Sequence, residues 1–266
     1  MSFPIELETI ESVAQTYSLG LPRLFVVFMI MPVLSKRFLG GAMIRNCALM
    51  SIALFLYPVT EGSIPNELTL SNYFSIFIKE VVLGVVMGYI ATVPFWVAQG
   101  VGFFIDNQRG AAMASMMNPL LGEQTSPLGL FLSQLLVTLF VISGALMALL
   151  VVLIQSYTIW PVGVLYPEFI DGLDTFALAQ LDLLMELIVV LSAPVILAMF
   201  LAEFALALIS RFAPQLNVFF LAMPVKSAVG FFVLVLYIRY LVDHLKDFID
   251  KVPEQIIDFI QAPLLF

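Results

Sequence analysis

The chain has almost none of the residues that build most catalytic, metal and disulfide sites. Its 266 residues include one cysteine, Cys47, and one histidine, His244. A single cysteine excludes an intrachain disulfide framework and a thiolate metal centre, and a single histidine excludes the multi-histidine zinc and iron sites. No P-loop and no HExxH, GxSxG or dinucleotide-binding glycine pattern occurs. The sequence therefore predicts that the protein is not an enzyme and uses no metal or cofactor.

Positive charge is also scarce. Eleven Lys and Arg residues stand against nineteen Asp and Glu, which gives a formal net charge of −8. No basic run is long or dense enough to follow a phosphate backbone, so nucleic acid is excluded as a partner. Three glutamates precede the first basic residue, Arg23, whereas a cleaved signal peptide begins with a basic segment. We therefore expect the mature protein to start near Met1.

The chain is instead rich in apolar sequence. Hydrophobic residues make up 62% of it and charged residues 11%, the composition of an integral membrane protein. Only two uncharged windows reach the roughly 20 residues that one span needs, namely the 25 residues of 81–105 and the 44 residues of 124–167. The longer window has room for two spans, or for one helix with an irregular end at Trp160-Pro161. Charges interrupt the other apolar segments at a cost of about 2.5–3.5 kcal/mol each near a helix centre, so protein should cover these segments.

The expected fold is all-α, because the ten-residue alternating segments of a membrane barrel are absent. We treat residues 1–266 as a single domain with helices near 5–35, 43–59, 70–105, 111–117, 126–160, 177–211 and 217–252. Breaks are expected at Pro58, Pro119, Pro161 and Pro214. Proline frees a carbonyl that lipid cannot satisfy, so the helices should be kinked and packed on one another. Basic loops usually face the cytoplasm, but six membrane crossings would place the basic C-terminal tail on the opposite side. We therefore expect that one segment is re-entrant or that the helices do not all cross the membrane in the ordinary way.

Several short motifs are candidate packing or ionic positions. Gly84 and Gly88 form a GxxxG pair, which either arises by chance or lets a second backbone approach closely. Lys79 and Glu80 are about 100° apart on a helix and cannot pair on one face of it, which favours a membrane boundary with the ammonium reaching outward. Glu203 lies in strongly apolar sequence and should pair with a partner's base or be protonated.

A polar stripe precedes a break near the middle of the chain. If the region is one helix, steps of three and four residues place the following side chains on one face: Asp106, Arg109, Met113, Met116 and Met117. One interpretation is a salt bridge followed by core methionines. The other is a deformable constriction, because the thioether side chain repacks easily. The stripe ends at Asn118-Pro119, and a polar loop follows. At membrane depth, such a loop is found only where it is buried in protein or lines a cavity.

The C-terminal segment 239–262 predicts an amphipathic helix. Charged residues fill the positions between apolar residues at helical spacing, which are Leu241, Leu245, Phe248, Ile249 and Val252. Pro253 should stop this helix. Its apolar face should lie on a membrane or on a partner, and the mixed charge of the other face favours a partner.

Two blocks of sequence resemble the FliR/SctT family, the export-gate subunit of flagellar and type III secretion systems. The first block, 79–129, contains Lys79-Glu80, Gly84, Pro94-Phe95-Trp96, Gln99-Gly100, Asp106, Gln108-Arg109-Gly110, Asn118-Pro119 and Ser126-Pro127-Leu128-Gly129. The second block, 211–226, contains Arg211, Pro214-Gln215, Asn217, Met223-Pro224 and Lys226. The chain resembles the virulence-associated injectisome branch more than the flagellar branch.

The resemblance implies kinked helical hairpins packed into a hetero-oligomeric spiral with SctR-like and SctS-like subunits. This spiral would be the entrance channel for unfolded secreted proteins in the bacterial inner membrane, within the secretion-system basal body and in contact with membrane lipid. A SctU-like switch protein would contact it from the cytoplasmic side, with a SctV-like export ring below. Stretches near Gln108 to Pro127 would approach the channel axis and form a plug.

From the motifs and the resemblance together we expect three groups of site residues. The pore or plug loop comprises Asp106, Gln108, Arg109, Gly110, Met113, Met116, Met117, Asn118 and Pro119. Helix kinks and packing involve Gly84, Gly88, Pro94, Trp96, Gln99, Pro214 and Pro224. Subunit contacts involve Lys79, Glu80, Glu203, Arg211, Gln215, Asn217 and Lys226.

Two other functions remain open on the sequence. One is a proton-coupled secondary transporter that uses Glu186, Glu203 and the Lys79-Glu80 region as a relay. The paired internal repeats typical of transporters are missing. The other is a membrane scaffold that lines no pathway.

Overall fold

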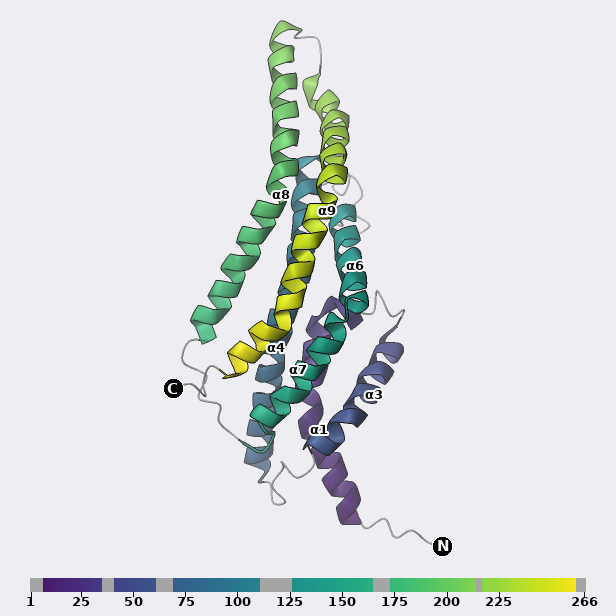
Figure 1. The fold of residues 1–266 in the computed structure, drawn as a ribbon, viewed down its shortest axis with the longest axis vertical. Helices are drawn as coiled ribbons and strands as arrows, with labels where there is room; N and C mark the ends of the chain where they lie inside the picture. The colour runs from purple at the N-terminus through teal and green to yellow at the C-terminus, as the bar shows by residue number, and fades with distance from the viewer. Residues whose placement is uncertain are drawn as a thin grey trace. The chain divides into compact units, whose positions relative to one another are not determined.

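Seven α-helices account for most of the chain in its computed structural model, which describes residues 7–34, 41–60, 69–110, 126–164, 173–213 and 217–261. No strand occurs in these ranges, which confirms the all-α prediction. The elements are α1 (Leu7–Ile30), the 3-10 helix η1 (Pro32–Leu34), α3 (Ala42–Thr60), α4 (Leu70–Gln108), α6 (Pro127–Ile142), α7 (Ala145–Ile159), α8 (Leu173–Phe212) and α9 (Val218–Gln261) (Figure 1).

Four of the described helices are long and apolar enough to cross a membrane: α1, α4, α8 and α9. Helices α6 and α7 together are a fifth candidate, separated by a break at Ser143 and Gly144. Gly144 has φ +83°, a conformation that residues with a Cβ rarely adopt. The 44-residue window thus holds two helices rather than one. The architecture is that of an all-α membrane protein.

Two of the predicted proline breaks are wrong. Helix α3 runs through Pro58 to Thr60, and α9 runs through Pro253 to Gln261. The second continues because Ile256 and Ile260 remain buried beyond the proline, and their burial offsets the roughly 3 kcal/mol that an internal proline costs. The break at Pro161 is confirmed, since α7 ends at Ile159. The expected breaks at Pro119 and Pro214 and the helix at 111–117 lie outside the described residues.

The chain divides into two compact units. Unit 1 comprises Met1–Thr92, Ser143–Ala177 and Asp250–Phe266, and unit 2 comprises Val93–Ile142 and Leu178–Ile249. Helices α4, α8 and α9 therefore each contribute residues to both units.

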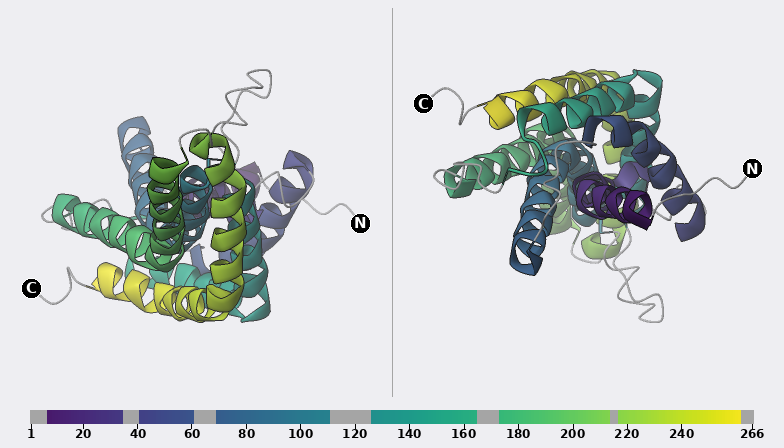
Figure 2. Two further views of the ribbon diagram at one scale, coloured as in Figure 1. Left: turned by 90° about the horizontal axis from the view of Figure 1, so that it is seen from above. Right: turned by 90° about the horizontal axis from the view of Figure 1, so that it is seen from below.

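In unit 1, glycines let α1 pack closely on α4. A Cβ on Gly84 would lie 2.7 Å from the carbonyl oxygen of Arg23, and a Cβ on Gly88 would lie 3.1 Å from the Cα of Val27. Helix α1 also lies beside α3 (Figure 2), with Gly20 facing Thr60. The GxxxG pair therefore forms a face on which a second backbone rests directly.

A buried ionic cluster joins α1, α4 and α7 in unit 1. The Arg23 and Glu80 side chains are both 0% exposed. The Arg23 guanidinium binds Glu80 through Nε at 2.7 Å and through its second terminal nitrogen at 2.9 Å. It also donates to the Ser156 hydroxyl and to the carbonyl oxygen of Trp160, and it lies 4.2 Å from the centre of the Tyr157 ring. One fully buried arginine thus connects three helices.

Lys79 completes this cluster, which overturns the expectation that its ammonium reaches outward. Its Nζ lies 2.9 Å from Glu80 and donates to the carbonyl oxygens of Pro161, Val162 and Val164 at 3.2, 2.8 and 2.8 Å. Carbonyls at and beyond a helix C-terminus lack intrahelical donors and favour a cation. Lys79 supplies these donors after α7, so both members of the Lys79-Glu80 pair are used inside the chain.

The C-terminal half of α9 is amphipathic as expected, but its apolar face packs within the chain and not on a membrane or a partner. The face is buried within the chain at Leu241, Leu245, Phe248, Ile249, Val252, Ile256 and Ile260. In unit 1, for example, the Phe259 ring packs on the Phe176 ring with centroids 4.7 Å apart. The expectation of an external surface for this stripe is therefore wrong, because packing within the chain buries it.

Candidate functional site

The predicted loop residues begin where α4 ends, in unit 2. Helix α4 stops at Gln108, and Gly110 has φ +89°, a left-handed conformation that favours glycine. Asp106 thus lies in the last turn of α4 and Arg109 directly after it, whereas the three methionines of the stripe lie outside the described residues. Seven of the expected site residues lie outside the described residues: Met113, Met116, Met117, Asn118, Pro119, Pro214 and Gln215.

The Asp106 carboxylate connects the end of α4 to the start of α6. One oxygen, Oδ1, lies 2.8 Å from Arg109 Nε, in an ion pair whose geometry is not that of a hydrogen bond. The other, Oδ2, accepts hydrogen bonds from the Ser126 hydroxyl at 2.7 Å and from the Leu128 backbone N–H at 3.0 Å. A carboxylate at a helix N-terminus is favoured by the orphan N–H groups and the helix dipole. Asp106, which is buried, thus holds residues on both sides of 111–125.

Ser126 is the N-cap of α6 and was not among the predicted site residues. Its hydroxyl donates to Asp106 and accepts from the Gly129 backbone N–H at 2.9 Å. The sequence contains the signal for this cap, since a serine followed by proline at the first helical position is typical of a helix start. The Ser126-Pro127 pair is therefore both part of the family signature and the start of α6.

Two glycines bring the backbones of α4 and α6 into direct contact beside this carboxylate. A Cβ on Gly102 would lie 2.4 Å from the Gly129 Cα, and a Cβ on Gly129 would lie 2.7 Å from the Gln99 carbonyl oxygen. Such distances leave no room for a methyl group on either helix. The Gln99 side chain is exposed, so this residue contributes to the crossing through its backbone.

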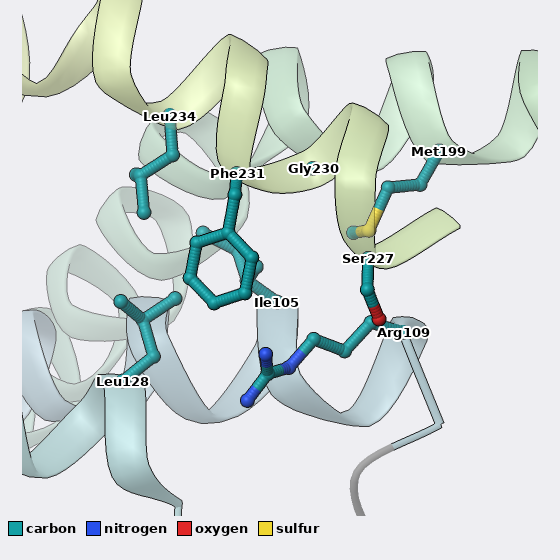
Figure 3. Close-up of a pocket in the computed structure, with 8 residues that line it drawn as sticks. All are labelled: Ile105, Arg109, Leu128, Met199, Ser227, Gly230, Phe231 and Leu234. Atoms are coloured by element: carbon teal, nitrogen blue, oxygen red, sulfur yellow. The ribbon is translucent and has the colours of Figure 1, made fainter. Parts of the chain in front are cut away.

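The Arg109 side chain lies at the edge of a small recess in unit 2. Its guanidinium carbon is 4.9 Å from the centre of the Phe231 ring, below the ring in Figure 3. The recess has a volume of about 190 Å³, which includes space open to the outside. Its lining is Ile105, Arg109, Leu128, Met199, Ser227, Gly230, Phe231 and Leu234. Arg109 is thereby held by a carboxylate on one side and an aromatic face on the other.

A second ion pair in unit 2 corrects the expectation for Glu203. Its Oε2 lies 3.1 Å from Lys226 Nζ, so a base of this chain rather than of a partner faces it. The exposed fractions are 44% for the Glu203 side chain and 12% for Lys226. Arg211 lies in the last turn of α8, where a cation suits the dipole, and Asn217 is exposed just before α9.

The remaining predicted residues have varied surroundings. Pro94 is buried inside α4, whereas Pro224 is exposed inside α9 and Trp96 is 38% exposed. Next to Pro94, the Phe95 ring packs edge-on against Phe140 with centroids 5.4 Å apart. Among the residues that the structure describes, no group of three or more His, Cys, Asp and Glu side chains could hold a metal ion.

Comparison with known proteins gives one consistent set of relatives. A family model described as "Bacterial export proteins, family 1" matches residues 14–252. The chain is 47% identical to the Yop proteins translocation protein T of Yersinia pestis, over 86% of this chain and 88% of that protein. It is 34% identical to the secretion system apparatus protein SsaT of Salmonella typhimurium, over 81% and 84% of the two chains. Identity to the flagellar biosynthetic protein FliR of Bacillus subtilis is lower, 30% over 70% and 73%.

Proposed function

This chain belongs to the FliR/SctT family, family 1 of the bacterial export proteins, and from that membership we propose that it is an export-gate subunit. It is an all-α membrane component of a type III export apparatus. In our proposal, it assembles with SctR-like and SctS-like subunits into the channel by which unfolded proteins enter the secretion system. In this proposal the subunit lies in the inner membrane, within the basal body of the secretion system. SctU-like and SctV-like proteins lie on its cytoplasmic side.

The observation that supports a gate is the position of Asp106. One carboxylate holds Arg109 before the 111–125 segment and Ser126 and Leu128 after it. A plug must move without detaching, so its two ends need a fixed base. The Asp106 contacts and the contact between Gly102 and Gly129 provide such a base.

In this mechanism the segment beyond the base closes the channel. Met113, Met116 and Met117 supply an apolar closure that repacks when a polypeptide passes, because thioether side chains are unbranched and polarizable. Kinks at the prolines near the base let the hairpins tilt around a pore. The subunit performs no catalysis in this proposal, and the energy for export comes from other components.

Leakage through the assembled complex tests the gate. Replacing Met113, Met116 and Met117 by Ala should raise the leakage of ions or small solutes while the complex still assembles. The matched control is the triple replacement of three exposed methionines outside the loop, Met43, Met50 and Met147. Unchanged leakage in the loop variant, with normal assembly, contradicts a gating role.

The contacts of the acidic residues give little support to a proton-coupled transporter. A relay needs carboxylates that face a path and can exchange protons. Both oxygens of Glu80 are held by cations, and its side chain is 0% exposed. Glu203 is paired with Lys226. We therefore favour the gate over the relay.

A further inference from the structure

A single ion contact leaves the orientation of the Arg109 head group unfixed. Its Nε lies 2.8 Å from Asp106 Oδ1 without hydrogen-bond geometry, and this is its only ion pair with a described residue. The Arg109 side chain is 18% exposed, so its surroundings do not enclose it completely. A guanidinium is fixed in direction when its planar fork binds two carboxylate oxygens, as Arg23 does with Glu80. Arg109 lacks that second contact and needs another element to hold it.

Helix α9 supplies that contact in unit 2. The Arg109 guanidinium carbon lies 4.9 Å from the centre of the Phe231 ring, which lies above it in Figure 3. A cation within about 6 Å of the centre of an aromatic face is attracted by the ring. Phe231 is itself 46% exposed, so the hydrophobic core does not lock it in place. The position of α9 therefore decides whether the ring lies over the guanidinium.

The same face of α9 also meets the next residue of the chain. Three side chains at intervals of four residues lie along this side of the helix: Met223, Ser227 and Phe231. Ser227 and Phe231 line the recess beside Arg109. A Cβ on Gly110 would lie 3.6 Å from Met223 Cγ, an ordinary contact distance. Gly110 is the last described residue before the 111–125 segment, so one stripe of α9 borders the start of that segment.

We propose that Phe231 is a positioning residue of the gate, which holds Arg109 against the end of α4 so that the position of α9 controls closure by the 111–125 segment. This inference rests on the proposed function, because it adds a regulatory contact to the same base. Asp106 connects α4 to α6, and Phe231 connects the same point to α9. A shift of α9 that carries the ring beyond about 6 Å frees the guanidinium. The segment then loses the support of α9 at one of its two ends.

Ion leakage through the assembled complex tests the role of Phe231. Phe231→Leu keeps an apolar side chain but removes the ring face, and we expect leakage to rise about two- to fivefold, the ratio that an exposed cation–π contact supports. Phe231→Tyr and Phe231→Trp keep an aromatic face and should leak as little as the unsubstituted chain. Phe232→Leu, at the neighbouring phenylalanine that is 67% exposed, is the matched control. If Phe231→Leu lowers assembly, Phe231→Met makes the same comparison with a longer, more adaptable side chain.

A double-variant cycle shows whether Phe231 acts through Arg109. Arg109→Gln removes the cation, so adding Phe231→Leu to it should raise leakage no further. Effects of the two substitutions that simply multiply, unchanged leakage in Phe231→Leu, or equal leakage in Phe231→Tyr and Phe231→Leu overturns the role of Phe231 alone. If the triple alanine variant of Met113, Met116 and Met117 leaks no more than the unsubstituted chain, the proposed gate falls, and the role of Phe231 falls with it.

Discussion

Arg23 and Glu80, 57 positions apart in sequence, form a two-pronged ion pair that is completely shielded from solvent. Arginine suits this role because its planar fork binds both carboxylate oxygens at once. The pair also receives Lys79, so two cations share one carboxylate among backbone carbonyls. Both cations therefore depend on Glu80 for their neutralisation, and the members of the cluster have distinct expected effects when changed.

Glu80→Gln should be the most damaging change in this cluster. The substitution leaves Arg23 and Lys79 buried without their shared anion, and an uncompensated buried charge costs about 3–5 kcal/mol. We expect a strongly reduced thermal stability of the detergent-purified complex and a reduced amount of chain in membranes. Glu186→Gln removes an exposed acid and should change neither quantity. Equal stability of the two variants would refute the structural role of Glu80.

Lys79→Met should be milder than Glu80→Gln, because Arg23 and Glu80 still neutralise each other. The carbonyls of Val162 and Val164 lose the Lys79 donor, at a cost of about 1–3 kcal/mol, whereas the Pro161 carbonyl still accepts from the Val164 backbone N–H. Hydrogen exchange should accelerate in the turn that follows α7 and stay unchanged in α6. Exchange that remains slow in this turn would show that Lys79 does not hold it.

Gly102→Ala should separate the backbones of α4 and α6. The added methyl group would lie 2.4 Å from Gly129 Cα, a contact that only backbone movement can relieve. Overpacking of this kind costs about 1–3 kcal/mol, and we expect loss of secretion together with lower stability. Gly41→Ala is the control, because a Cβ there meets no atom within 4 Å. Normal secretion by the Gly102 variant would mean that the crossing tolerates a wider spacing.

Asp106→Asn should loosen the base of the 111–125 segment while leaving the helices folded. The amide keeps one acceptor oxygen but loses the charge that attracts Arg109 and the N-terminus of α6, a loss of about 1–2 kcal/mol. We expect higher ion leakage through an otherwise assembled complex, measured with a dye or a conductance assay. The exposed acid Asp243 on α9 provides the control variant, Asp243→Asn. Identical leakage in both variants argues against the base as a determinant of closure.

Residue patterns predicted several local features correctly and missed others for identifiable reasons. The Asp106–Arg109 spacing predicted an ion pair, and the structure contains it with the i,i+3 geometry of a helix end. The environment of Lys79 was mispredicted because the spacing rule considers only one helix, whereas its acceptors lie 82 to 85 positions further along the chain. The cap at Ser126 was visible in the sequence, but its partner Asp106 lies 20 positions away.

The class of the protein was determined by sequence alone. An apolar, charge-poor chain must form membrane helices, and each charge inside those helices must find a counterion, because the cost of a bare charge in an apolar medium is independent of the fold. Which charges meet was decided only by tertiary structure. Arg23 reaches Glu80, and Lys226 reaches Glu203, because glycines and small side chains let particular helices approach within reach of those side chains. Periodicity within one helix contains no information about such long-range pairs.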